Sequence, residues 1–136
     1  MRKKFFALIF LLISCSPASP KEYQYEGEDV CKSILKILQK IESVSDLNRE
    51  GIRLKKEYAR LVKVMIEAKK FQLRHKEIEF MAPSNFEVSE ALKNEFIRIY
   101  EIEGCQEKME ALQRESLHKL HQYQRRIEGL KSETYR

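Results

Sequence analysis

Three side chains near the C-terminus have the residue types and the spacing of half a metal site. Glu115, His118 and His121 follow one another at intervals of three, so on a helix they share one face. A carboxylate-bridged metal site in a helical bundle also needs a second Glu-x-x-His pair on another helix. The remaining histidine, His75, stands between an arginine and a lysine, whose charges disfavour a bound cation. We therefore expect a solvated helix face here, with no metal and no other cofactor.

The other reactive side chains do not form a catalytic pattern either. A hydrolytic serine on a strand-to-helix elbow is flanked by glycines as Gly-x-Ser-x-Gly, and no serine of this chain is. Phosphate loops of the Walker and Rossmann types need closely spaced glycines, whereas the whole chain holds four. Paired acids such as Glu77 and Glu79 point to different faces of a helix. The sequence thus predicts a protein that is not an enzyme.

The first fifteen residues have the pattern of an export signal. A basic start is followed by nine apolar residues, 5–13, and then by Ser14 and Cys15. Nine residues are about half of the roughly 20 that a helix needs to cross a bilayer core, so a permanent transmembrane anchor is not expected. We expect residues 1–14 to be a signal peptide that is removed.

The last four residues of this segment, Leu12, Ile13, Ser14 and Cys15, resemble the lipobox of bacterial lipoproteins. In that box a leucine and two small or aliphatic residues precede an obligatory cysteine, whose thiol receives a diacylglyceryl group. The resemblance implies that Cys15 is lipidated and becomes the mature N-terminus. It also implies a protein anchored by lipid in the cell membrane or the outer membrane, facing the periplasm or the exterior.

The charge of the mature chain does not indicate nucleic-acid binding. The formal net charge is +5, but three basic residues and no acid leave with the signal, so 23 bases and 21 acids remain. Basic and acidic residues are interspersed along the whole chain, as they are on an ordinary solvated helical surface. We expect no nucleic-acid partner.

Apolar residues recur at spacings of three and four through most of the mature chain, which predicts helices. Proline-containing residues 15–27 are expected to form a flexible tether, followed by one helical domain at 28–136. Its predicted helices run over Glu28–Val44, Asp46–Phe80 and from about Phe86 to Leu130, with a turn at Met81–Asn85.

The expected architecture is all-α: an up-down-up three-helix bundle, or a helical hairpin, with a long third helix that overhangs the others. At 1.5 Å per residue the third helix would approach 70 Å, against roughly 50 Å for the second. Gly104 is the one place where it could break, and the alternative is a fourth, short helix that folds back there. An overhang needs a partner, so we expect its apolar seam to bind one; that seam consists of Met109, Leu112, Leu117 and Leu120.

Cys31 and Cys105 remain once Cys15 carries lipid. Paired cysteines in a small exported domain are commonly bridged. In an up-down-up bundle with turns near residues 46 and 83, positions 31 and 105 both lie level with about position 62 of the second helix. We therefore expect a disulfide between Cys31 and Cys105.

Together these features predict a lipid-anchored helical scaffold or protein-interaction module of the cell envelope. Its expected contacts are the membrane, through the N-terminal lipid, and a protein partner or a second copy, through the third helix. The alternative is a chaperone-like or small-ligand-binding envelope lipoprotein, which would need an exposed apolar groove between helices.

Overall fold

The computed structural model describes the backbone of residues 20–76 and 86–134, and the side chains of residues 20–76 and 87–130. This part of the chain forms four α-helices and no strands: α2 (Pro20–Gln39), α3 (Val44–Arg74), α4 (Phe86–Tyr100) and α5 (Cys105–Thr134). The all-α prediction is confirmed, whereas four helices take the place of the three that we expected. The predicted signal and lipobox at 1–15, the expected helix end at Phe80 and the predicted turn at 81–85 lie outside the described residues.

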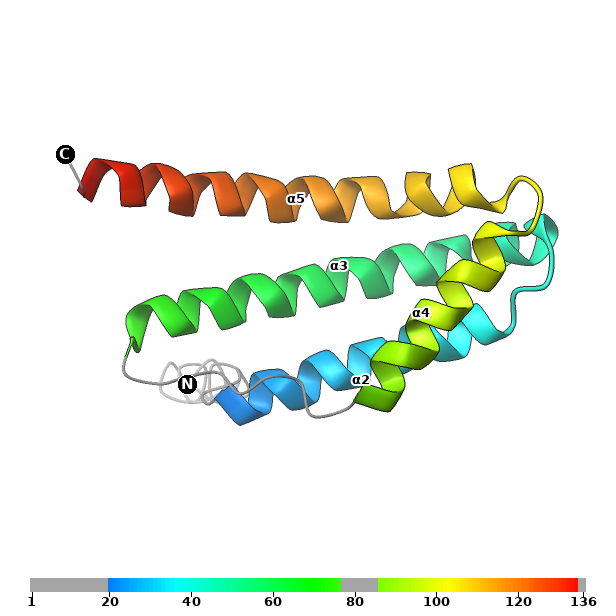
Figure 1. The fold of residues 1–136 in the computed structure, drawn as a ribbon, viewed down its shortest axis with the longest axis horizontal. Helices are drawn as coiled ribbons and strands as arrows, with labels where there is room; N and C mark the ends of the chain where they lie inside the picture. The colour runs from blue at the N-terminus through cyan, green and yellow to red at the C-terminus, as the bar shows by residue number, and fades with distance from the viewer. Residues whose placement is uncertain (1–19, 77–85, 135–136) are drawn as a thin grey trace, which may run out of the picture.

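The helix α3 is central to the arrangement. Figure 1 shows α2 along one side of α3 and α5 along the other, while α4 lies across α2 and meets α5 near the connection between them. The helices α2 and α4 run in one direction, and α3 and α5 run in the other. We call the end that holds the connections at 40–43 and 101–104 the closed end. The opposite end, where α2 begins and α3 and α5 end, is the open end.

The boundary between α2 and α3 lies a few residues earlier than predicted. Ser43 caps α3: its hydroxyl accepts a hydrogen bond from the backbone N–H of Asp46 at 3.1 Å. The Asp46 carboxylate in turn accepts one from the backbone N–H of Glu42 at 3.0 Å, which lowers the pKa of that carboxyl from its ordinary value. These reciprocal bonds fix the turn, so α2 ends at Gln39 and α3 begins at Val44.

The helix α2 begins at Pro20, eight residues before the predicted start at Glu28. Residues 20–27, which we assigned to the tether, are therefore helical. Proline lacks an N–H and has a fixed φ, and both properties suit the first turn of a helix. Tyr23 then holds this turn against the end of α3, because its buried ring lies 5.6 Å from the ring of Phe71.

All four helices contribute to one hydrophobic core at the closed end. Its members are almost completely shielded from solvent, and each carries an apolar side chain from a position at helical spacing. They are Val30, Ile34, Leu38 and Ile41 of α2 and its end, Leu47 and Leu54 of α3, Ile99 of α4, and Cys105 and Met109 of α5. Burial on this scale is the main source of stability in a domain of this size.

Arg98 fastens α4 to the end of α2. Its guanidinium donates to the backbone carbonyls of Ile41 at 2.7 Å and Leu38 at 2.9 Å, and to the Glu95 carboxylate at 2.7 Å. The Leu38 carbonyl also accepts a hydrogen bond from the backbone N–H of Ile41 at 3.1 Å, so the arginine fork adds a charged donor to the carbonyls at the end of α2. This contact directs α4 across α2.

The predicted continuous third helix is wrong: it breaks at 101–104. Gly104 adopts a φ of +81°, in the left-handed region that glycine tolerates best, and a Cβ there would lie 3.1 Å from Cγ2 of Val44. The chain reverses at this point, and α5 packs beside α3 instead of overhanging it. This is the fold-back alternative, although the returning helix has 30 residues and is not short.

The predicted disulfide between Cys31 and Cys105 is also wrong, because both thiols are free. The prediction counted positions along an uninterrupted third helix, whereas Cys105 follows the reversal and lies at the closed end. No residue of α2 has its Cα within 8 Å of a Cα of α5, so Cys31 and Cys105 are farther apart than that. A disulfide needs Cα atoms within about 7 Å of each other.

Candidate binding groove between α3 and α5

At the closed end α3 and α5 approach each other closely. Gly51 of α3 faces Leu112 of α5, and a Cβ at position 51 would be in ordinary van der Waals contact with the Leu112 side chain, at 3.5 Å. About two turns further along α3, the hydroxyl of Tyr58 accepts a hydrogen bond from the side-chain amide of Gln113 at 3.3 Å. Burial raises the pKa of Tyr58 to about 12, although this hydrogen bond acts in the opposite direction.

Beyond Tyr58 the two helices enclose a groove, formed by two adjoining hollows of about 280 Å³ and 440 Å³. Both hollows include Met65 and Leu120, so they continue into each other. The inner one is also lined by Tyr58, Leu61, Val62, Gln113, Ser116 and Leu117, and the outer one by Lys69, Tyr123, Gln124, Ile127 and Glu128. We call these residues together the α3–α5 groove.

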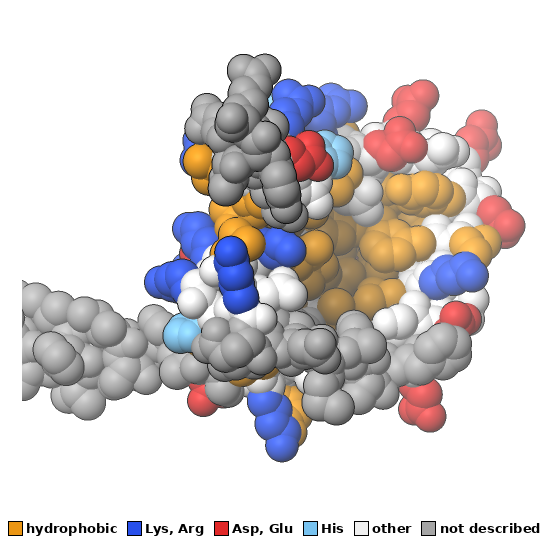
Figure 2. Space-filling model, turned by 60° about the vertical axis from the view of Figure 1, so that its left-hand side comes forward, with side chains coloured by type: hydrophobic (Ala, Val, Ile, Leu, Met, Phe, Trp, Pro, Cys, Tyr) orange, Lys and Arg blue, Asp and Glu red, His pale blue; other side chains and the backbone are white. Residues whose placement is uncertain are grey.

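Apolar side chains in the groove remain open to solvent. Met65 and Leu117 are each 45% exposed, although they face the space between two helices. Figure 2 shows that hydrophobic side chains gather in a hollow of the molecular surface. The groove exists because α4 is half as long as α3 and packs on α2, so that no fourth helix covers α3 beyond the closed end.

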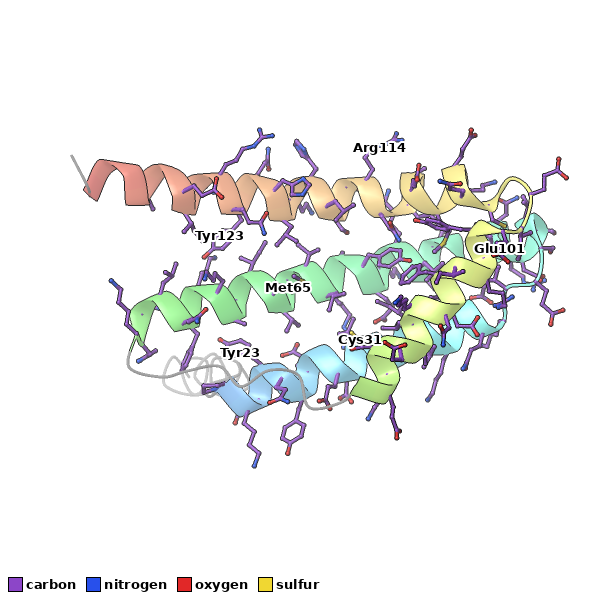
Figure 3. The ribbon with its side chains drawn as sticks, viewed as in Figure 1. Tyr23, Cys31, Met65, Glu101, Arg114 and Tyr123 are labelled. Carbon is purple, nitrogen blue, oxygen red and sulfur yellow. The ribbon has the colours of Figure 1, made fainter. Side chains whose placement is uncertain are left out.

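Side chains of α5 that line the groove point toward α3. Figure 3 shows Tyr123 pointing from α5 toward α3, while Arg114 points away on the opposite face of the helix. The polar groups Gln113, Gln124 and Glu128 lie among the apolar ones. An apolar floor with polar groups beside it is typical of protein interfaces.

The structure divides the predicted partner-binding seam in two. Met109 is completely buried in the core and Leu112 packs against Gly51, so these two residues bind within their own chain. Leu117 and Leu120 line the groove. Sequence analysis missed the residues of α3 that complete it, because Met65 and its neighbours have the same apolar spacing as core residues.

The acid and histidine face of α5 is solvated. Glu115 lies 3.3 Å from the ammonium of Lys55 and 3.9 Å from that of Lys119, and both His118 and His121 are exposed. In the described part of the chain, no three histidine, cysteine or acidic side chains come together as a metal site would require. Burial raises the pKa of the Cys31 thiol, and it does the same for Cys105, so neither cysteine has the lowered pKa of a nucleophile.

None of the four described helices is both long enough and apolar enough to span a membrane. Comparison of the chain with protein-family models, with curated proteins and with solved structures finds no match.

Proposed function

We propose that the mature chain is a non-enzymatic interaction module, anchored by lipid in the bacterial cell envelope, that binds an apolar helical segment of another protein in the α3–α5 groove. The observation that carries this proposal is the groove itself, with Met65 and Leu117 exposed on facing helices. A folded chain gains free energy by covering such side chains, so a partner with a matching apolar face would bind here.

The dimensions of the groove favour a helix as the occupant. From Tyr58 to Lys69 it follows α3 for eleven residues, which is about 17 Å or three helical turns. An amphipathic helix laid in a groove of this length would place its residues i, i+3 or i+4 and i+7 against the floor. A site for a small molecule usually encloses most of its ligand, whereas Met65 and Leu117 of this groove are each 45% exposed.

The lipid anchor rests on the basic start, the apolar segment and the lipobox-like residues that end at Cys15. Cells grown with a fatty-acid analogue should incorporate the label into the wild-type chain and not into Cys15→Ala. Equal labelling of the two chains would contradict the anchor without bearing on the groove.

The groove is tested by photo-crosslinking in intact cells. A photoreactive residue at Leu117 should capture one envelope protein, and the substitution Met65→Glu on the facing helix should abolish that capture. Ile52 is 75% exposed and lies outside the groove, so Ile52→Glu is the matched control and should leave capture intact. Capture that survives Met65→Glu would contradict the proposal, and capture of the same chain would identify the occupant as a second copy.

The second candidate function is binding of a small apolar ligand, as in a chaperone-like or ligand-binding lipoprotein. It is favoured by the outer hollow, whose volume of about 440 Å³ lies within the range of known ligand pockets. A fluorescent fatty acid should then bind to the wild-type protein with one-to-one stoichiometry. The substitution Leu120→Glu should abolish this binding. If the probe does not bind, while Leu117 still captures a protein, the interaction module is the correct alternative.

A further inference from the structure

The two ends of the molecule differ in charge. The described residues of the open end are 20–26, 67–76 and 121–130, which lie toward the same end of the long axis in Figure 1. Seven lysines and arginines lie in these segments against four glutamates. The bases are Lys21, Lys69, Lys70, Arg74, Lys76, Arg125 and Arg126, and the acids are Glu22, Glu26, Glu67 and Glu128.

The closed end has the opposite balance. Its connecting segments, 40–49 and 101–108, carry five acids and three bases: Glu42, Asp46, Glu101, Glu103 and Glu107 against Lys40, Arg49 and Lys108. The helix α3 separates the two ends by about 45 Å, which is several times the Debye length of about 8 Å at physiological ionic strength. Each end therefore presents its own charge to its surroundings.

The basic side chains of the open end are available to a partner. All seven are exposed, and among the ion pairs between described residues only Lys70 is engaged, with Glu67 at 3.4 Å. The same segments also carry exposed apolar side chains: Leu130 is 65% exposed and Leu73 is 37% exposed. Exposed bases mixed with exposed leucines suit the headgroup region of a membrane.

The chain also enters the fold at this end. Only residues 16–19 separate Cys15 from Pro20, where α2 begins, so the two positions are at most about 18 Å apart. A lipid on Cys15 would thus hold the start of α2, and with it the open end, close to the bilayer surface. The closed end, with its acidic balance, would point away from it.

We infer that the open end binds the anionic phospholipid headgroups of the membrane in which the Cys15 lipid is inserted. This inference rests on the lipid anchor of the proposed function. The bundle then stands on the membrane by its open end, with the closed end about 45 Å above the surface and the α3–α5 groove opening sideways.

The experiment uses tryptophan fluorescence, since the chain contains no tryptophan of its own. Mature lipidated protein carrying Leu130→Trp is inserted into vesicles of brominated phosphatidylcholine, with or without phosphatidylglycerol. We expect bromine to quench the emission in the vesicles that contain phosphatidylglycerol, and high salt to restore it. The control Ile52→Trp places a reporter toward the closed end, at a position that is 75% exposed, and should keep its emission throughout.

Charge variants then identify the contact. Each base near an anionic surface strengthens binding about fivefold, so Arg125→Gln with Arg126→Gln should weaken the contact by roughly 25-fold and restore the Leu130→Trp emission. The matched pair Lys40→Gln with Lys108→Gln, at the closed end, should not.

Equal quenching in vesicles without phosphatidylglycerol would overturn the inference, because proximity alone would then explain it. Equal emission of the two reporters in anionic vesicles would overturn it as well. If the protein does not remain on vesicles at all, the lipid anchor itself is absent and the inference fails with it.

Discussion

The closed and open ends of this molecule are built from the same helices but differ in what covers them. Met109 and Leu117 lie two turns apart on α5, yet Met109 is completely buried and Leu117 is 45% exposed. The difference is the fourth helix: α4 spans 15 residues against the 31 of α3, and it packs on α2. Burial of an apolar position thus depends on the length and direction of a helix elsewhere in the sequence.

The largest expected difference between the ends is in stability. Leu54→Ala empties a fully buried site and should lower the free energy of unfolding by about 2–5 kcal/mol. Leu117→Ala removes an exposed side chain and should cost less than about 1 kcal/mol. Urea unfolding of the two variants measures both values. Similar losses would mean that the α3–α5 groove is as well packed as the closed end.

Alkaline pH should destabilise the fold at Tyr58, where the closely packed part of α3 and α5 borders the groove. The pKa of Tyr58 is raised to about 12, so between pH 10 and 12 the unfolded chain has lost a proton that the folded chain retains. The stabilisation is therefore complete below pH 10, and about 2–3 kcal/mol is lost as the pH rises through this window. Tyr58→Phe should remove that part of the pH dependence. Tyr25→Phe, at an exposed tyrosine, should retain it.

Arg98→Ala tests how much the contact between α4 and the end of α2 contributes to the stability of the closed end. The substitution leaves the carbonyls of Leu38 and Ile41 without their charged donor, so we expect a loss of about 2 kcal/mol in the free energy of unfolding. Arg98→Lys keeps the charge but cannot reach two carbonyls in a fork, and should recover only part of the loss. Full recovery by lysine would show that charge alone holds α4 in place.

Substitutions at two glycines should have the smallest single effects on stability, with opposite signs. Gly104→Ala forces an alanine into a positive φ beside Val44 at the closed end, which should cost about 1–2 kcal/mol. Gly129→Ala lies within α5 at the open end, where a Cβ meets nothing within 4 Å, and should stabilise the helix by up to about 1 kcal/mol. Thermal unfolding of both variants decides whether Gly104 is held in this conformation.

Much of the local structure could be predicted from the sequence. Apolar spacing indicated an all-helical chain, and Gly104 was recognised as the one place where a long helix could break. The start of α2 was missed because Pro20 was treated as a helix breaker, although a proline in the first turn costs no hydrogen bond. The cap at Ser43 was missed by two residues, since Ser45 and Asp46 offer the same chemistry.

The candidate site was less predictable than the fold. Periodicity identifies the apolar side of α5 but does not say which helix covers each part of that side, so Met109 and Leu117 had the same prediction and have different surroundings. Met65 on α3 has the spacing of a core residue, and its exposure follows from where α4 goes. The position of Cys105 along the bundle could not be predicted either, because the chain reversal at 101–104 places this residue at the closed end.

Amide hydrogen exchange along α5 compares the two ends most directly, because one helix crosses both. The structure predicts slow exchange in residues 109–116, which follow the first turn of α5 and lie nearest the core, and distinctly faster exchange in residues 117–130, beside the groove. Uniformly slow exchange along the whole helix would contradict the account, since the open end would then be covered and would offer no free groove to a partner.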